Sequence, residues 1–293
     1  MAENIQVQRP EFVREVETGA FGVVEKSLSR WQRISNRSGL RKMALLLLLA
    51  GFWEIYATVL GNALLFPKFS DTFIAFYDGV LKEDHILLLR GWYSIRILVQ
   101  GYAAGLVLAG ILTTLAITTR VGNDLLETLT AMFNPLPAIA LLPLALIWFG
   151  LGSASIVFVL IHSVLWPVAL NMHSGFQSVS QTMRMVGRNY GLSGVRFVAK
   201  ILMPAAFPNI LAGMKIGWAF AWRTLIAAEL VFGVSSRSGG LGWFIYENKN
   251  QLEIANVFAG LFSVIVIGLI VENFIFRNIE KRTVQVWGMQ SAN

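Results

Sequence analysis

Three ionisable side chains interrupt an apolar stretch at residues 201–236: Lys215, Arg223 and Glu229. If this stretch is helical, Lys215 and Glu229 share one face, about 40° apart around the axis and about 21 Å apart along it. Trp222 lies between them on that face, and Arg223 is about 100° further around. A basic group beside an aromatic one can bind a passing anion weakly. Trp222, Arg223 and Glu229 are therefore candidates for lining a path through which an anion moves.

Structural roles for the same charges remain open. Charged groups inside a membrane are costly and usually face a cavity or a partner. The long side chain of Lys215 is expected to reach the inner lipid headgroups. Arg223 can instead pair with an acid on another helix, and Glu54 is a candidate for that acid. A lone His162 is expected to pack or to form a hydrogen bond rather than to bind a ligand.

Residues that could support catalysis or metal binding are scarce. The chain has no cysteine and only three histidines, which excludes disulfides, iron–sulfur clusters and cysteine-ligated zinc. It has no Ser–His–Asp set, no His-Glu-x-x-His motif and no Gly-rich phosphate loop ending in Gly-Lys-Ser/Thr. We therefore predict no catalytic residue, no metal site and no cofactor on this chain. If ATP drives its activity, a separate chain must hydrolyse the ATP.

The elements that must position these residues are transmembrane helices. Hydrophobic residues make up 55% of the 293 residues and charged residues only 14%, against about 25% charged in soluble domains. A membrane span needs about 20 mostly apolar residues, and the dry bilayer core favours helices. The runs poor in charge predict an all-α integral membrane protein with six transmembrane helices, at residues 43–62, 97–119, 128–149, 154–173, 206–232 and 253–275.

The distribution of Lys and Arg predicts that both termini are cytoplasmic. In that orientation sixteen of the 24 basic residues lie inside and six outside, which follows the positive-inside rule. The net charge of +7 is then explained without nucleic acid. The expected domains are a cytoplasmic tail at 1–42, a membrane domain at 43–275 and a cytoplasmic tail at 276–293. The first tail is either an interfacial helix or partly disordered. Outside, Ser70 or Asp71 is expected to cap a short helix.

Prolines and small residues mark two of the spans. Pro137 and Pro143 in the third span each remove a backbone donor and free a carbonyl. Broken helices at membrane depth are tolerated where they pack within protein or line a cavity, so both prolines are candidates for the path, with a packed kink as the alternative. Gly101, Gly105 and Ala109 recur every four residues in the second span, which predicts close helix packing.

The loop between the fourth and fifth spans, residues 176–204, is basic and too structured for a passive connector. A helical piece ends near Gly191, a turn follows, and a second piece leads to Pro204. This pattern resembles the coupling loop of binding-protein-dependent ABC importer permeases. That family's signature is E-A-A, three residues, Gly, nine residues, then I-x-L-P. Aligning Gly191 with the signature glycine brings Ile201 and Pro204 into register.

The resemblance implies that this loop contacts an ATPase. The residues that it assigns to this coupling are Met185, Val186, Gly187, Arg188, Gly191, Leu192, Ser193, Ile201 and Pro204. The E-A-A positions hold Met185, Val186 and Gly187, so the signature acid is missing. One polar contact to the ATPase is therefore replaced or absent.

Two further stretches resemble one subgroup of these permeases, the sulfonate, taurine, nitrate and bicarbonate type. Residues 134–152 are similar to its third-span pattern, P-x-I-A-L-x-P-L-x-x-x-W-F-G-x-G. Residues 221–231, followed by 239–243, look like its region between the fifth and sixth spans. The resemblance covers about residues 65–288 and leaves the first 40 residues outside.

The resemblance implies a complete importer around this chain. It implies a second copy of the permease, two cytoplasmic ABC ATPases that carry ATP and magnesium, and an extracytoplasmic solute-binding protein. The location would be the bacterial inner membrane, and the cargo a small anion such as a sulfonate, taurine, nitrate, bicarbonate or an aromatic carboxylate. A stand-alone secondary transporter is the alternative, although such folds often show two related halves and this sequence has no internal repeat. A membrane-embedded enzyme would need more convergent polar groups than the sequence offers.

Overall fold

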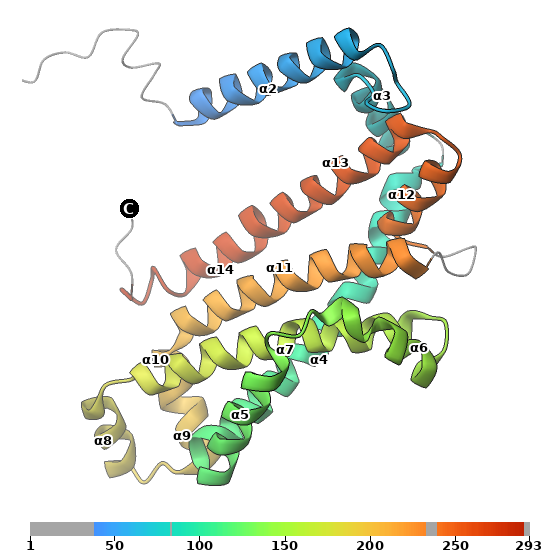
Figure 1. Ribbon diagram of the computed structural model, residues 1–293. Coiled ribbons are helices and arrows are strands. Elements are labelled where there is room, and N and C mark those ends of the chain that lie inside the picture. Colours follow the sequence, from blue (N-terminus) through green and yellow to red (C-terminus); the bar gives the residue numbers. More distant parts are fainter. Residues whose placement is uncertain (1–37, 83, 233–238, 290–293) are drawn as a thin grey trace, which may run out of the picture. The chain divides into compact units, whose positions relative to one another are not determined.

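The computed structural model describes residues 38–82, 84–232 and 239–289, and every regular element within them is helical (Figure 1). The elements are α2 (Ser38–Leu60), α3 (Phe69–Leu81), α4 (Ile86–Thr118), α5 (Arg120–Phe133), η1 (Ala138–Leu141), α6 (Leu142–Phe149), α7 (Ser153–Ser178), α8 (Gln181–Asn189), α9 (Gly194–Phe197), η2 (Val198–Leu202), α10 (Met203–Ala205), α11 (Phe207–Phe232), α12 (Leu241–Asn250), α13 (Ile254–Ile270), η3 (Val271–Phe276) and α14 (Arg277–Arg282). The expected all-α class is thus confirmed. Two compact units meet inside α2, at residues 50 and 51, and all contacts below lie within residues 51–293.

The candidate spans are partly straight and partly bent. Among the residues that the structure describes, four helices are long and apolar enough to cross a membrane: α2, α4, α7 and the helix that continues from Ile254 to Arg282. Two bent pairs bring the number to as many as six. α5 meets η1–α6 at 89°, and the helix Gly194–Ala205 meets α11 at 82°. The predicted third span is therefore not one straight helix.

The connection between the first and second predicted spans differs from the prediction in two ways. α4 begins at Ile86 rather than at residue 97, because Arg90 and Arg96, whose charges indicated a loop, belong to the helix. α3 ends at Leu81 as expected, but neither Ser70 nor Asp71 caps it. Glu54 supplies the acceptor instead, since its carboxylate accepts the backbone N–H of Ser70 at 3.0 Å and the Ser70 hydroxyl at 2.9 Å. Glu54 is therefore not the partner of Arg223.

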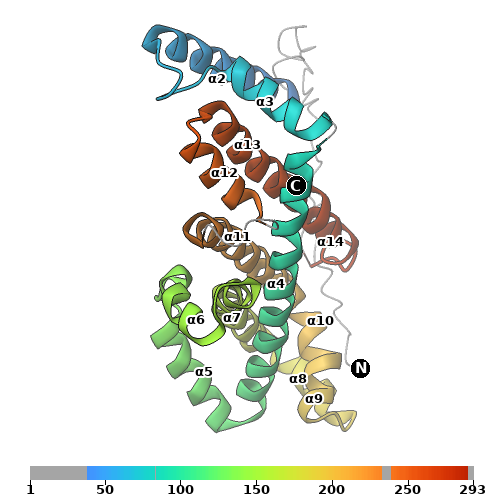
Figure 2. The ribbon, with the colours of Figure 1, turned by 90° about the vertical axis from the view of Figure 1, so that its right-hand side faces the viewer.

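The centre of the fold is a close packing of α4, α7 and α11, which Figures 1 and 2 show side by side. Gly101 and Gly105 of α4 lie against Leu160 and Val164 of α7. A Cβ atom added at Gly101 would lie only 2.5 Å from the Leu160 Cβ, so any side chain would force the helices apart. The spacing of small residues in the second span correctly predicted this contact.

We expect Gly105→Val to destabilise the membrane domain. A Cβ at Gly105 would lie 2.7 Å from the Val164 Cβ and 3.3 Å from the Ile161 carbonyl oxygen. Overpacking of this kind costs about 1–3 kcal/mol. Thermal unfolding in detergent would measure the loss, with Gly110→Val as the matched control because a Cβ there meets nothing within 4 Å. Equal unfolding temperatures for the two variants would contradict the prediction.

Candidate translocation cavity and coupling loop

The bend of the predicted third span begins at a proline-rich turn. α5 ends at Phe133, and Pro137 then precedes η1 with extended backbone torsions. Pro143 lies in the first turn of α6, where the missing N–H would lack an intrahelical partner in any case. The expectation that Pro143 breaks the span is therefore wrong, and the break is made earlier, at residues 134–137.

A cavity of about 300 Å³ lies beside this break, between it and the middle of α7 and α11. Its walls are formed by Asn134, Pro135, Leu136, Pro137, Ala138, Ile139, His162, Ser163, Trp166, Pro167, Phe220, Arg223 and Thr224. The structure thus brings together two of the predicted path residues, Pro137 and Arg223. An irregular backbone segment at the middle of a helical bundle is the setting in which membrane proteins place their polar sites.

Arg223 is the cationic group of the cavity. Its Nε donates to the carbonyl of Ala219 at 3.0 Å, and its guanidinium carbon lies 5.1 Å from the centre of the Phe220 ring. No carboxylate lies within 4 Å of it in the described part of the chain. The side chain is exposed on the single chain, and it lies about 24 Å from the start of α11 and about 14 Å from its end. A cation so far inside a span usually faces a cavity or a partner.

An aromatic wall supports the cavity from α7. The rings of Phe133 and Trp166 stack with their centres 5.4 Å apart, and His162 packs edge-on against both. The Trp166 indole nitrogen and both His162 ring nitrogens are buried without a hydrogen-bond partner among the described residues. His162 therefore packs as expected but does not form the hydrogen bond that was the other expectation.

Trp222 and Glu229 do not line this cavity, and the face of α11 that they share by their spacing lies about 100° around the helix from Arg223. Trp222 is buried against α13 and donates its indole N–H to the Val264 carbonyl at 3.3 Å. Glu229 is buried at the other end of α11. Helical spacing was correct, but that face of α11 packs against neighbouring helices. Pro143 also lies outside the cavity.

Glu229 instead fixes the position of α12. Its two carboxylate oxygens each lie 2.9 Å from the Ser94 hydroxyl of α4, which donates to them, and one accepts the Gly242 backbone N–H at 2.8 Å. The Ser94 hydroxyl in turn accepts the N–H of Leu241 at 2.9 Å. Both N–H groups belong to the first turn of α12, where an acidic side chain is favoured. Glu229 thus ties three helices together.

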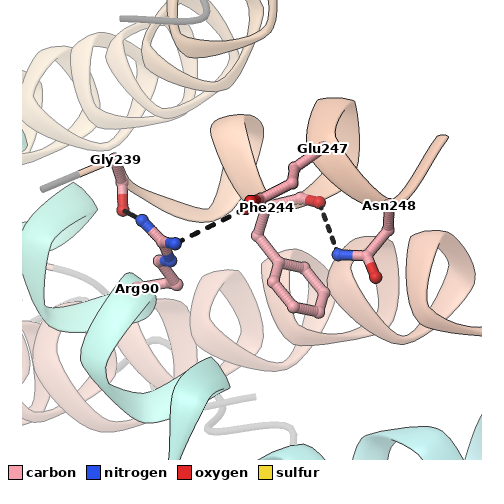
Figure 3. A network of polar contacts seen from close by, with 5 residues as sticks. All are labelled: Arg90, Gly239, Phe244, Glu247 and Asn248. Carbon is pink, nitrogen blue, oxygen red and sulfur yellow. Dashed lines mark hydrogen bonds and ion pairs between the residues drawn. The ribbon is translucent and has the colours of Figure 1, made fainter. Parts of the chain in front are cut away.

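Arg90 of α4 makes a second link to α12 and to Gly239, which precedes it. Arg90 of α4 donates to the Gly239 carbonyl at 2.9 Å, and its guanidinium approaches the Glu247 carboxylate at 3.5 Å (Figure 3). Farther along α12, the Asn248 side-chain amide donates to the Phe244 carbonyl at 2.8 Å. No local sequence pattern predicts the long-range contacts of Arg90 with Gly239 and Glu247, because neither partner stands out when considered alone.

Lys215 does not extend to headgroups as expected. Its ammonium group lies 2.8 Å from the Glu280 carboxylate of α14. Both side chains are about three-tenths exposed, 29% and 28%. The pair therefore joins the first half of α11 to the end of the last helix rather than serving the path.

The coupling loop has the predicted helix–turn–helix form. α8 is capped by Ser180, whose hydroxyl accepts the Met183 N–H at 3.4 Å, and the chain turns at Gly191 with φ of +70°. That left-handed torsion favours glycine because other side chains clash there. The second piece starts at Gly194 and continues through the π-helical η2 to Ala205. This form agrees with the alignment, while the assignment of its residues to an ATPase remains a prediction.

The interior of the loop is tightly packed, and its exposed face carries large apolar side chains among polar ones. Gly187 is buried against Phe197 and Ile201 of the second piece. Met185 and Val186 point outward, 56% and 45% exposed. Apolar side chains exposed on a short amphipathic helix mark a surface that another protein can cover.

Comparison with known proteins places these features in one family. Residues 101–285 match the family described as binding-protein-dependent transport system inner membrane component, a match that covers more than half of the chain. The chain belongs to this family. The permease is therefore a transport protein rather than an enzyme, and it is a multi-pass protein of the inner membrane. Its role as the membrane subunit of an ABC importer is confirmed, and the stand-alone secondary transporter is set aside.

Individual relatives agree with this assignment. The permease is 28% identical to a putative ABC transporter permease protein of Methanocaldococcus jannaschii over 243 residues. This alignment covers 82% of this chain and 90% of that one. It is 31% identical to the nitrate import permease protein NrtB of Synechocystis, over 66% of this chain and 68% of that one. It is also 31% identical to the taurine transport system permease protein TauC of Escherichia coli, over 60% of this chain and 62% of that one. The predicted subgroup is thus confirmed.

Proposed function

We propose that the permease forms the path for a small anion in an ATP-driven importer. Two of the relatives described above are named for nitrate and taurine, and two more are named for aliphatic sulfonates and bicarbonate. One structural observation carries the proposal: a cavity midway along α7 and α11 holds Arg223, which has no carboxylate within 4 Å in the described part of the chain. A transported anion supplies the missing counter-charge.

The working assembly comprises two copies of the permease, two ABC ATPases and an extracytoplasmic solute-binding protein. ATP and magnesium bind to the ATPases rather than to this chain, and both termini face the cytoplasm. The coupling loop, residues 176–204, docks on the ATPases through the residues that the family signature assigns to it. The family match supports the ATPase and the binding protein as partners.

A single helix, α11, connects the coupling loop to the cavity. The second piece of the coupling loop, Gly194–Ala205, joins α11 through an 82° bend. α11 carries both Arg223 and Glu229, and Glu229 holds α12 near the opposite end. Movement of the loop as the ATPases close therefore shifts one rigid helix that reaches the cavity and the external side. Such a two-state element is what alternating access requires.

We expect Arg223→Ala to lower ATP-driven anion uptake by at least tenfold without preventing assembly. Losing one charge-assisted hydrogen bond costs about 1.5–3 kcal/mol, and 1.4 kcal/mol is a factor of ten. The measurement is uptake of a labelled anion into vesicles that contain the permease and its ATPase, with the binding protein outside. Co-purification of the ATPase with the variant provides the assembly control. Uptake at the unsubstituted rate would remove Arg223 from the path.

A further inference from the structure

We propose that the cavity at Arg223 is a binding station for an organic anion, an acid head group on a compact apolar body, and not for a bare inorganic anion. This inference rests on the proposed function and narrows its cargo. Three observations carry it: the polar donors that line the cavity, the apolar and aromatic groups that line it with them, and its size.

The polar side chains that line the cavity can hold an oxyanion head group. The Nε–H of Arg223 already donates to the Ala219 carbonyl, so its two terminal nitrogens offer up to four N–H donors, in a planar arrangement that suits a sulfonate or a carboxylate. Thr224 of α11 and Ser163 of α7 line the same cavity, and their hydroxyl oxygens lie 3.4 Å apart. At that separation either hydroxyl can turn from its neighbour to an anion. Head-group recognition therefore involves two helices that pack against each other.

The remaining walls suit a carbon skeleton. Pro137 and Ile139 contribute from the broken span, Phe220 from α11, and Trp166 from α7. The volume of about 300 Å³ falls at the lower end of the 300–1,000 Å³ common for organic ligands, whose pockets are mostly apolar with a few placed polar groups. An inorganic anion of three or four heavy atoms would reach the guanidinium but leave the apolar walls uncovered. An organic anion fills both parts.

The charge arrangement suits a cargo that enters and leaves. A permanent carboxylate beside Arg223 would neutralise it and compete with any anion. Within the part of the chain that the structure describes, Arg223 donates to the Ala219 carbonyl and lies over the Phe220 ring. Both orient the guanidinium without neutralising its charge. The cation is therefore held in place and remains available to a mobile anion.

The test uses the purified permease–ATPase complex in detergent. The solute-binding protein is left out so that its own ligand site does not contribute to the measured binding. Calorimetric titration would compare benzenesulfonate with nitrate. We expect benzenesulfonate to bind at least tenfold more tightly than nitrate. Arg223→Gln should weaken its binding at least tenfold, whereas Arg96→Gln should not change it, because Arg96 is an exposed arginine of α4 outside the cavity.

A milder variant guards against loss of folding. Thr224→Val keeps the shape and the charge of the cavity but removes one hydroxyl donor, and it should weaken benzenesulfonate binding several-fold in a monodisperse complex. Unchanged affinity for benzenesulfonate in both Arg223→Gln and Thr224→Val would overturn the proposal that the cavity binds the anion. Dissociation of the permease pair in Arg223→Gln alone would also overturn it, since the guanidinium would then serve the contact between copies.

The remaining outcomes separate this inference from the proposed function. Equal affinity for nitrate and benzenesulfonate would overturn the organic class, while ATP-driven uptake that depends on Arg223 would leave anion import standing. Failure of both titration and uptake would remove the two proposals together.

Discussion

The variant Gly187→Val is expected to lose its ATPase while keeping its membrane helices folded. A Cβ at Gly187 would lie 2.8 Å from Phe197 Cε2 and 2.9 Å from Ile201 Cγ1, so valine must push α8 away from the second piece of the loop. Overpacking costs about 1–3 kcal/mol, which corresponds to ATPase binding weaker by about 5- to 150-fold if that binding needs the native loop. Co-purification of the ATPase in detergent measures the loss.

The design includes a rescue. Gly187→Ala combined with Phe197→Leu adds one methyl group and removes part of the ring that it would meet, so this pair should bind the ATPase more tightly than Gly187→Val. Circular dichroism should give the same helical content for all variants, because the clash is confined to the loop. Full ATPase recovery with Gly187→Val would show that the loop is not the docking element, and would leave the alignment of Gly191 without functional meaning.

The coupling loop illustrates what the sequence could predict. The position of Gly187 corresponds to the last small residue of the E-A-A signature, and the structure gives its reason, since no side chain fits against Phe197. The turn glycine Gly191 has the torsion that its place in the signature requires. Local backbone needs of this kind are visible in a sequence because one residue type satisfies them. The missing acid at Met185 is different, since Met185 is exposed and its partner would lie on another chain.

Long-range polar partners were the main failure. Arg90 suggested an external loop because a charged residue argues against a span, yet the Gly239 carbonyl and Glu247 satisfy it inside the fold. α12 was missed because it is short and carries Glu247 and Lys249, which do not resemble a membrane segment. Ser94 and Glu229 are 135 residues apart in sequence. No local pattern connects them, and only the packing of α4 against α11 reveals that they meet.

Glu229→Ala is expected to cause a large loss of stability in the part of the molecule where α4, α11 and α12 meet. The substitution leaves the Gly242 N–H and the Ser94 hydroxyl without their shared acceptor in a site where Glu229 is only 5% exposed. A buried donor left unpaired costs about 1–3 kcal/mol, so two of them, with the void left by the side chain, should cost roughly 2–5 kcal/mol. Thermal unfolding of the purified permease in detergent measures this change.

The conservative variant distinguishes a hydrogen-bonding role from a role in the path. Glu229→Gln keeps the shape and an oxygen that can accept the Gly242 N–H, and its amide can donate to the Ser94 hydroxyl oxygen. We therefore expect Gln to recover most of the stability and most of the ATP-driven uptake that Ala loses. If stability were normal in both variants while uptake failed in both, the carboxylate would act on the cargo directly, and Glu229 would return to the path. If Gln instead restores both together, Glu229 acts by holding α12 on α4 and α11, and Arg223 is left as the charged group that faces the cargo.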